Sequence, residues 1–408
     1  MNKPLCGTKL TGEILEQALV AAGKAAPGSL DSVSAEKIGN CEGYMSDILR
    51  VFLVWKECRK TSAYPNKILV KMPKQDSVDI LTESFDQKLA DQIKQSVKVD
   101  ILTRIECAVY RMFSKEAPEI PIPKCYAVCT KAFVRLRPFV LKDTVAEENP
   151  MVFIAMEDLS PRAETPDITS GLTKGQLINC AEALAALQAW SFNTPYEWKK
   201  EVPDMLTHAD RALSLLGSIE KQLQVSIKKY PAHFKCVDAK KISAALCDRE
   251  KTIAAMTAYK KLVPDVLVHG DFWANNILFE VDNKTNSVSD RIAAIIDWQV
   301  CHQGSFAEDL ARLYSYSVDA DVRRSTMMDV FRHYFDKMKM WAPGAISSVP
   351  FEIAYHIFEN AVFHNALMLV VYATYFSDFL ARDNPTLESA LLRRLEENYK
   401  DAARFFNF

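Results

Sequence analysis

The segments His269-Gly-Asp-Phe-Trp-Ala-Asn-Asn276 and Ile295-Ile-Asp-Trp-Gln299 limit the folds open to this chain more than any other part of its sequence. Between them lie two short strand-like runs joined by the polar, turn-rich residues DNKTNSVSD, which is the pattern of a β-hairpin. Asn276 enters the first strand and Asp297 follows the second. Because antiparallel pairing brings those two ends together, the sequence predicts that the two side chains meet at one rim of the hairpin.

The rest of the sequence divides into a β-rich first part and a mainly helical second part. Alternating apolar and polar residues predict strands at 47–55, 67–72, 125–129, 133–140 and 151–156. Helical spacing lies between the second and third of these runs, and it dominates from Leu172 onward. We therefore place a boundary near Asp158 and predict an α+β fold with a β-rich N-terminal lobe, residues 1–158, and a mainly helical C-terminal lobe, residues 159–408.

Composition narrows the classes of function. The 408 residues, 49% of them hydrophobic, can bury a sizeable core. Fifty basic residues against fifty-two acidic ones give a net charge of -2, and no run of like charges is long enough to bind nucleic acid or anionic lipid. Ten scattered cysteines without a paired CxxC pattern are typical of reduced thiols. With no apolar stretch of membrane-spanning length, we expect a cytoplasmic protein with no nucleic-acid or membrane partner, and nothing implies a protein partner.

The hairpin region carries the side chains that phosphoryl transfer requires. That reaction needs a carboxylate to orient the attacking hydroxyl and accept its proton, together with oxygen ligands for Mg²⁺. Asp271 is our candidate for the first role, and Asn276 and Asp297 are candidates for the second. Taken singly, each could be a turn or strand-end residue, and only their joint spacing favours catalysis. We expect His269 to brace the backbone rather than to move protons.

Two further side chains fit a site that binds phosphates. A cation must contact the α- and β-phosphates, and a carboxylate from a neighbouring helix must hold that cation in place. Lys71, within the strand-like run KILVKM, fits the first role. Glu106 fits the second, because it interrupts an apolar helical stripe and would be costly to bury unpaired. An exposed strand lysine and a solvated helix flank are the structural alternatives.

A loop before the first strong strand contains two glycines four residues apart. The segment is Ile38-Gly-Asn-Cys-Glu-Gly-Tyr-Met-Ser46, and its position upstream of Lys71 favours a phosphate cover. Gly39, Gly43 and Ser46 are the candidate contacts, since glycines let backbone amides approach phosphate closely. A simple turn explains the same residues equally well.

The passages VLVHGDFWANNILF and AAIIDWQVCHQGSFAEDLARL resemble the ecdysteroid-kinase-like, or CHK-kinase-like, family, close to its nematode branch. That family is related to choline kinases and aminoglycoside phosphotransferases within the protein-kinase-like superfamily, and the resemblance runs from about Lys37 to Tyr399. It implies a bilobal kinase fold, ATP and Mg²⁺, with Asp271 as catalytic base and Asn276 and Asp297 as metal ligands.

The same resemblance implies two further contacts. Backbone groups near Glu157, where the chain crosses between lobes, would meet adenine, and Asp309 would brace the catalytic loop. A plain first-turn carboxylate that complements the helix dipole is the alternative for Asp309.

The acceptor is expected to be a small molecule. Phe272-Trp273 replaces the Leu-Lys of protein kinases, Trp-Gln follows Asp297, and no Ala-Pro-Glu occurs between Asp297 and the end of the sequence given. The interval from Asp297 to the helix near Glu308 is also too short for a segment that docks a peptide. We expect an ATP- and Mg²⁺-dependent phosphotransferase acting on a steroid, choline-like or xenobiotic alcohol. The alternatives are a catalytically inactive kinase-fold protein that binds a nucleotide or small molecule, and a helical interaction protein.

Overall fold

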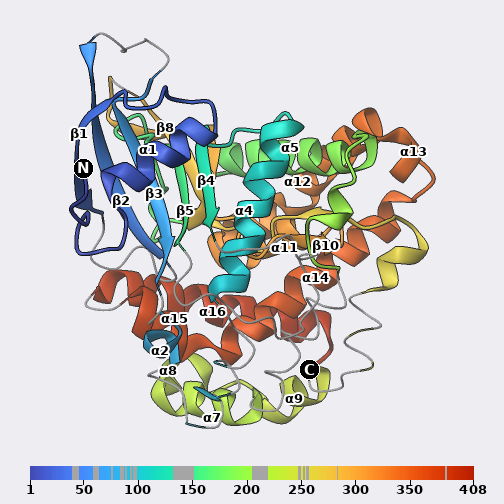
Figure 1. Ribbon diagram of the computed structural model, residues 1–408. Helices are drawn as coiled ribbons and strands as arrows, with labels where there is room; N and C mark the ends of the chain where they lie inside the picture. Colours follow the sequence, from blue (N-terminus) through green and yellow to red (C-terminus); the bar gives the residue numbers. More distant parts are fainter. Residues whose placement is uncertain are drawn as a thin grey trace.

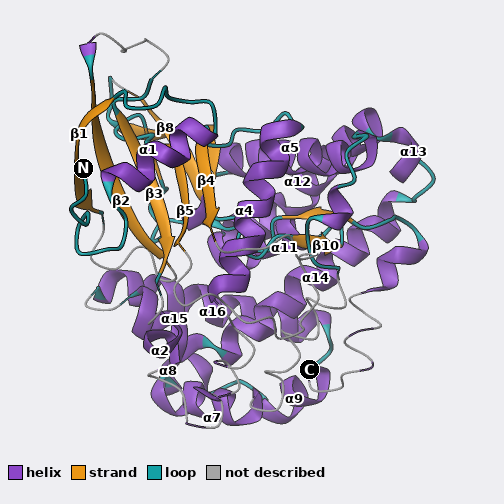
Figure 2. Cartoon of the chain, viewed as in Figure 1, coloured by secondary structure: helices purple, strands orange, loops and turns teal. Residues whose placement is uncertain are grey.

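The computed structural model describes the chain apart from residues 39–45, 58–63, 75–76, 83–86, 88–89, 92–93, 95–98, 132–150, 205–218, 247–249, 251–252, 254–256, 283 and 382–383. A five-stranded sheet formed by the N-terminal part stands beside a mainly helical C-terminal part (Figures 1 and 2). This arrangement confirms the predicted α+β class, with a β-rich N-terminal region and a helical C-terminal region.

The N-terminal sheet is antiparallel throughout, with strand order β1-β2-β3-β5-β4. Its strands are β1 (Leu30–Lys37), β2 (Ser46–Trp55), β3 (Lys67–Pro73), β4 (Cys125–Lys131) and β5 (Met151–Glu157). In β2, Leu49, Val51 and Leu53 are buried while Phe52 and Val54 are exposed on the opposite face, as the twofold alternation of a strand requires. The strands predicted at 47–55, 67–72, 125–129 and 151–156 are thus confirmed, and the run at 133–140 lies outside the described residues.

The sequence did not lead us to expect two of the N-terminal elements, helix α1 (Gly12–Ala21) and strand β1. Helix α1 begins at Thr11, whose hydroxyl accepts a hydrogen bond from the amide of Ile14, a normal N-cap. It buries Leu15 and Leu19 in the same apolar cluster as the buried face of β2. Helix α1 therefore covers one face of the sheet.

Helix α4 (Val99–Lys115) lies against the sheet beside β3 and β4 (Figure 1). Its buried residues Ile105, Val109 and Met112 recur at helical spacing, and Glu106 is buried among them. The helix predicted around this carboxylate is confirmed. A shorter helix, α2 (Ser77–Thr82), precedes it.

The C-terminal part is built around helix α5 (Lys174–Asn193), which begins with a capping box formed by Thr173 and Gln176. Two small sheets pack with it, β6-β8-β9 and β7-β10. Their strands are β6 (Ala163–Glu164), β7 (Val266–Val268), β8 (Ile277–Asp282), β9 (Ser287–Ile295) and β10 (His302–Gly304). In the part of the chain that the structure describes, the remaining helices of four or more residues are α7 (Ile219–Lys229), α8 (Pro231–Phe234), α9 (Ala239–Leu246), η4 (Ala258–Lys261), α11 (Glu308–Ser317), α12 (Ala320–Trp341), α13 (Pro343–Ile346), α14 (Phe351–Val371), α15 (Ala373–Leu380) and α16 (Pro385–Phe405).

Helices α14 and α15 meet at Tyr372. None of the helices among the described residues is long and apolar enough to cross a membrane.

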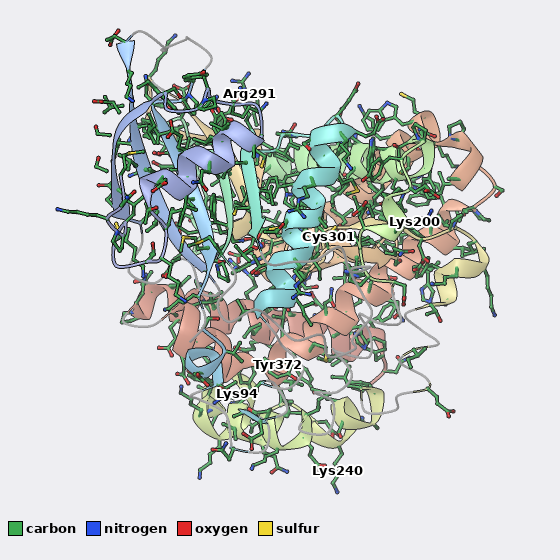
Figure 3. The ribbon with its side chains drawn as sticks, viewed as in Figure 1. Lys94, Lys200, Lys240, Arg291, Cys301 and Tyr372 are labelled. Carbon is green, nitrogen blue, oxygen red and sulfur yellow. The ribbon has the colours of Figure 1, made fainter. Side chains whose placement is uncertain are left out.

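Cys301 lies in the interior, whereas Lys200 and Lys240 lie at separate edges of the molecule (Figure 3). The cysteines described as free thiols are Cys6, Cys107, Cys125, Cys129, Cys180, Cys236 and Cys301.

Asp158 ties two strands of the sheet to the chain that leaves it. Its carboxylate accepts hydrogen bonds from Arg50 Nε of β2 at 2.7 Å and from the Ser160 amide at 3.0 Å, and Lys67 Nζ of β3 lies 3.1 Å away. Burial alone would raise the pKa of Asp158, but the bonds from Ser160, Arg50 and Lys67 outweigh it and lower that pKa to about 2. The charged carboxylate thus fixes the path of the chain from β5 toward the helices.

We expect Asp158→Asn to lower the free energy of unfolding by about 1–3 kcal/mol, because it removes a buried carboxylate that satisfies several donors. Glu36→Gln is the matched control, since Glu36 pairs with the same Arg50 but its side chain is 55% exposed. The control should lose less than about 0.5 kcal/mol. Urea unfolding of the two variants measures both values, and equal losses would show that Asp158 has no special role.

Candidate active site

The loop from His269 to Asn276 connects β7 to β8 and is held in an unusual backbone conformation. Gly270 has a φ of +82°, and a Cβ atom there would lie 2.5 Å from the carbonyl oxygen of Val300. Only glycine fits this position without displacing backbone. The loop ends in a short 3-10 turn, Ala274–Asn276, which leads directly into β8.

Asp309 braces the start of this loop from the first turn of α11. Its two carboxylate oxygens accept hydrogen bonds from the backbone amides of His269 at 2.8 Å and Gly270 at 2.9 Å. Burial raises the pKa of Asp309 to about 7, although the two amides oppose the shift. The bracing contact expected from the sequence is therefore present.

The ring of His269 holds the loop from inside. The Asp271 amide donates to Nδ1 at 3.2 Å, and Nε2 lies 2.9 Å from the carbonyl oxygen of Ile296. A neutral ring with its proton on Nε2 satisfies both contacts. The ring also packs against Trp298, with 4.5 Å between centroids. Burial lowers the pKa of His269 to about 4, so its contacts are those of a structural brace.

The hairpin brings Asn276 and Asp297 to the same end, as its strand pattern predicts. Ile277 pairs with Ile295, and the amide of Ile296 donates to the carbonyl oxygen of Asn276 at 3.0 Å. Asn276 Nδ2 donates to the Asp271 carboxylate at 2.9 Å. Asp297 has a φ of +66°, a left-handed conformation that is uncommon for a residue other than glycine and often marks functional sites.

Lys71 joins the sheet, helix α4 and the hairpin at one point. Its Nζ lies 2.7 Å from Glu106 Oε2 and 2.7 Å from Asp297 Oδ1. Burial alone would lower the pKa of Lys71, but the two carboxylates outweigh that effect and raise it. Burial raises the pKa of Glu106 to about 7 although Lys71 opposes the shift. Five of the candidate residues thus fall into two connected groups, Lys71 with Glu106 and Asp297, and Asp271 with Asn276.

Of the other candidates, the structure describes Ser46 and Glu157, which make their contacts outside these two groups. Gly39 and Gly43 lie outside the described residues. Ser46 is the first residue of β2, opposite Pro73. At the end of β5, Glu157 donates its amide to the carbonyl oxygen of Lys124 at 2.9 Å.

One charged residue of the site was missed in the sequence. Arg312, in α11, donates from Nε at 2.9 Å and from Nη2 at 2.5 Å to Oδ1 of Asp271. Residues three apart lie on the same face of a helix, so the spacing of Asp309 and Arg312 could have indicated that both face the loop.

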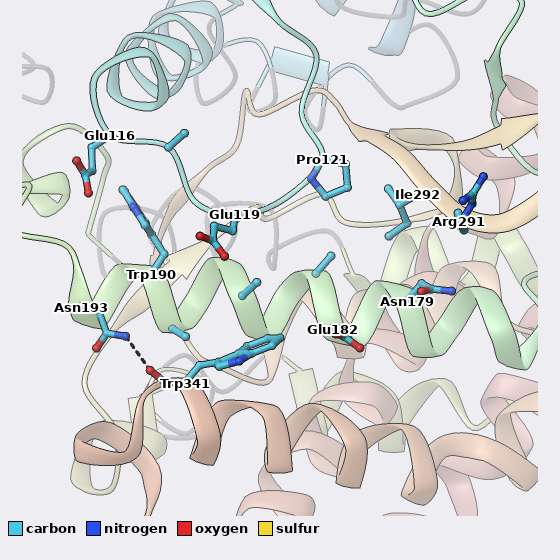
Figure 4. Close-up of a pocket in the computed structure, with 14 residues that line it drawn as sticks. Glu116, Glu119, Pro121, Asn179, Glu182, Trp190, Asn193, Arg291, Ile292 and Trp341 are labelled. Atoms are coloured by element: carbon cyan, nitrogen blue, oxygen red, sulfur yellow. Dashed lines mark hydrogen bonds between the residues drawn. The ribbon is translucent and has the colours of Figure 1, made fainter.

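A separate cleft of about 800 Å³ lies between the α4–β4 connection, α5 and β9 (Figure 4). Its walls include Glu116, Glu119, Trp190 and Trp341. Asn193 donates to the carbonyl oxygen of Trp341 at 2.8 Å at its edge. None of the candidate catalytic or metal-binding residues lines this cleft.

Comparison with known proteins links the chain to nematode sequences. The family model DUF1679, described as "Uncharacterized oxidoreductase dhs-27", matches residues 24–360. The Caenorhabditis elegans protein "Uncharacterized oxidoreductase dhs-27" is 22% identical over 328 residues, which cover 78% of this chain but only 36% of that protein. The chain therefore spans about a third of the length of this relative. The Caenorhabditis elegans "Uncharacterized kinase-like protein D1044.1" is 23% identical over 311 residues, 73% of each chain.

Solved structures with a similar arrangement have little sequence identity. The GDP complex of wild-type aminoglycoside 2'-phosphotransferase-IIIa is 13% identical, with a TM-score of 0.44 over 98% of this chain and 100% of that one. The microcompartment-associated aminopropanol kinase is 11% identical, with a TM-score of 0.43 over 96% and 98%.

The buried, neutral His269 predicts a specific pH dependence of stability. Its folded pKa of about 4 lies below the ordinary value of 6.5, so the unfolded chain binds more protons between these values. The free energy of unfolding should therefore fall as the pH drops from about 6.5 to about 4. Urea unfolding of wild type and His269→Gln across this range measures the contribution, which should be no more than about 3 kcal/mol. Titrating carboxylates affect both proteins alike, and equal pH slopes would contradict the assignment.

Proposed function

This chain belongs to the DUF1679 family, and we propose that it is an ATP- and Mg²⁺-dependent phosphotransferase that acts on a hydroxyl group of a small molecule. The observation that carries the proposal is the buried Lys71 ammonium, held at 2.7 Å from both Glu106 and Asp297. A cation held in this way suits the α- and β-phosphates of a nucleotide. The same hairpin end presents Asp271 and Asn276, linked at 2.9 Å.

The oxidoreductase description of the family does not suit the residues of this chain. Nicotinamide-dependent oxidoreductases of the Rossmann type bind their cofactor with a GxGxxG turn in a parallel sheet. No two of the twelve glycines in this sequence are separated by a single residue, so that turn is absent. The five-stranded sheet of the described residues is antiparallel. The named oxidoreductase also extends well beyond the part that this chain matches.

Asn276 and Asp297 suit Mg²⁺ because amide and carboxylate oxygens are the ligands that this ion prefers. Among the described residues, no group of three or more His, Cys, Asp and Glu side chains could hold a metal. Two protein ligands fit a site in which phosphate oxygens complete the coordination. When bound, the ion would neutralise phosphate charge. The Asp297 side chain is 27% exposed, so it can be reached from solvent.

In the proposed reaction each side chain has one task. Glu106 holds the Lys71 ammonium, which contacts the α- and β-phosphates. Asp271 orients the acceptor hydroxyl and accepts its proton as the oxygen attacks the terminal phosphorus. The bond from that phosphorus to the β–γ bridging oxygen breaks, and ADP leaves with the electron pair. Asp309 and His269 keep the loop backbone in place through the contacts described above.

The phosphate contacts below rest on the position of the glycine-containing loop upstream of Lys71, and the adenine contact and the acceptor class rest on the resemblance to ecdysteroid-kinase-like proteins. We propose Gly39, Gly43 and Ser46 as phosphate contacts and the backbone near Glu157 as the adenine contact. A steroid, a choline-like alcohol or a xenobiotic alcohol is the proposed acceptor class. An inactive nucleotide-binding protein of the same fold is a weaker proposal, because it would have no chemical need for Lys71 together with Asp271, Asn276 and Asp297.

We expect Asp271→Asn to lower kcat by about 10²–10⁴-fold, because it removes the group that accepts the proton. The rise in Tm caused by ATP and Mg²⁺ should remain, since a ligand stabilises the folded state that binds it. Asp297→Ala should reduce this rise as well as the rate. Asp282→Asn, on an exposed position of the same hairpin, is the control. Wild-type turnover in Asp271→Asn would rule out the proposed base.

The acceptor can be sought directly. Purified protein with ATP and Mg²⁺ should add one phosphate to at least one compound in a panel of hydroxylated steroids, amino alcohols and xenobiotic alcohols, detected as the mass gain of a phosphoryl group. No stabilisation by ATP and Mg²⁺ together with no phosphorylated product would remove the proposed function.

A further inference from the structure

We propose that Arg312 is a positioning residue that fixes the Asp271 carboxylate and, by its charge, disfavours cationic acceptors. The inference rests on the proposed function, because it assigns a role to a partner of the proposed base. The residue lies outside the HGDFWANN loop, which carries no cation between Asp271 and Asn276. The positive charge beside the base therefore comes from another element, α11.

The two oxygens of the Asp271 carboxylate are held by different groups. Arg312 donates to Oδ1 from both Nε, at 2.9 Å, and Nη2, at 2.5 Å. Asn276 donates to Oδ2 from Nδ2 at 2.9 Å. Hydrogen bonds between charged groups are strong and directional, and contacts to both oxygens restrict rotation of the carboxylate. The side chain of Asp271 keeps 22% of its surface exposed, so an acceptor hydroxyl can still reach it.

Arg312 is itself held in place. Its guanidinium carbon lies 4.2 Å from the ring centre of Tyr316, one turn further along α11, within the range of a cation–π contact. The Tyr316 ring in turn meets the ring of Trp273 in the loop edge to face, at 6.2 Å. Arg312 is therefore fixed between the carboxylate that it holds and an aromatic pair that spans the helix and the loop.

Helix α11 holds the loop at two points one turn apart. Asp309 accepts the backbone amides of His269 and Gly270, and Arg312 donates to the Asp271 side chain. Both residues lie on the same helical face, and the helix buries Leu310, among others, in the core. One rigid element thus sets both the path of the loop and the direction of its carboxylate.

The charge of Arg312 has a consequence for the acceptor. The Arg312 side chain is 28% exposed, so a molecule that presents its hydroxyl to Asp271 arrives next to a guanidinium group. The Asp271 charge is already compensated, and a face of the Tyr316 ring is occupied by Arg312. A quaternary ammonium group near the reacting hydroxyl would therefore meet repulsion from the guanidinium and would compete with it for the Tyr316 ring. Uncharged alcohols are the favoured acceptors.

The first test separates positioning from structural support. Arg312→Gln should lower kcat by about 10–100-fold, because a misplaced reacting group has this effect, while KM for ATP stays within about twofold and the Tm rise with ATP and Mg²⁺ persists. Arg312→Lys should restore part of kcat, since its ammonium replaces the charge but not the two-pronged contact. Arg324→Gln is the matched control. It removes the ion pairs from Arg324 of α12 to Glu397 and Asp401 of α16, and it should retain wild-type kinetics.

The second test concerns charge. Acceptors are supplied as pairs that differ only in a trimethylammonium or a tert-butyl group, such as choline and 3,3-dimethylbutan-1-ol. Wild type should favour the uncharged members by at least about tenfold in kcat/KM, and Arg312→Gln should reduce this ratio. Equal or greater kcat/KM for the cationic members overturns the selectivity, and unchanged kcat in Arg312→Gln overturns the positioning role. Either result leaves phosphoryl transfer in wild type, so it is distinguishable from failure of the proposed function.

Discussion

The ammonium group of Lys71 lies between the carboxylates of Glu106 and Asp297, which belong to different parts of the chain. Burying an unpaired charge is very costly, so the lysine on β3 and the glutamate on α4 are stable inside the protein only together. Asp297 extends the pairing to the end of the β8–β9 hairpin. The position of the sheet relative to the helical part is therefore coupled to the geometry of the site.

On the other side of the site, the loop depends on α11 as well as on its own residues. Gly270 and Asp297 both have left-handed backbone conformations, which glycine adopts readily but which Asp297 keeps only with support from its surroundings. The Asp309 carboxylate accepts a hydrogen bond from the backbone amide of Gly270 and so holds the loop at this position. His269 links the loop to the carbonyl oxygen of Ile296, next to Asp297. The loop and the hairpin end thus form one hydrogen-bonded unit.

The oxidoreductase description of the family does not agree with the side chains of the candidate site. A dinucleotide-dependent oxidoreductase needs backbone space for a pyrophosphate at a glycine-rich turn, whereas this chain holds the buried Lys71 ammonium between the carboxylates of Glu106 and Asp297. The relative described as kinase-like matches 73% of its own length, compared with 36% for the relative described as an oxidoreductase. The proposal of phosphoryl transfer rests on these side chains and not on the name of a relative.

The periodicity of apolar residues in the sequence was sufficient to determine the features that depend on residues close together along the chain. It gave strands β2 and β3, helix α4 with Glu106 on its apolar stripe, and the hairpin that aligns Asn276 with Asp297, because strand and helix repeats are local properties of the chain. It did not give α1 or β1, where the apolar signal is short, nor the contact of Arg312 with Asp271. Those two residues are 41 positions apart, and a contact at that separation depends on how α11 packs beneath the loop. Tertiary packing decided which charges meet, since a charged side chain in the sequence carries no sign of the partner that will neutralise it.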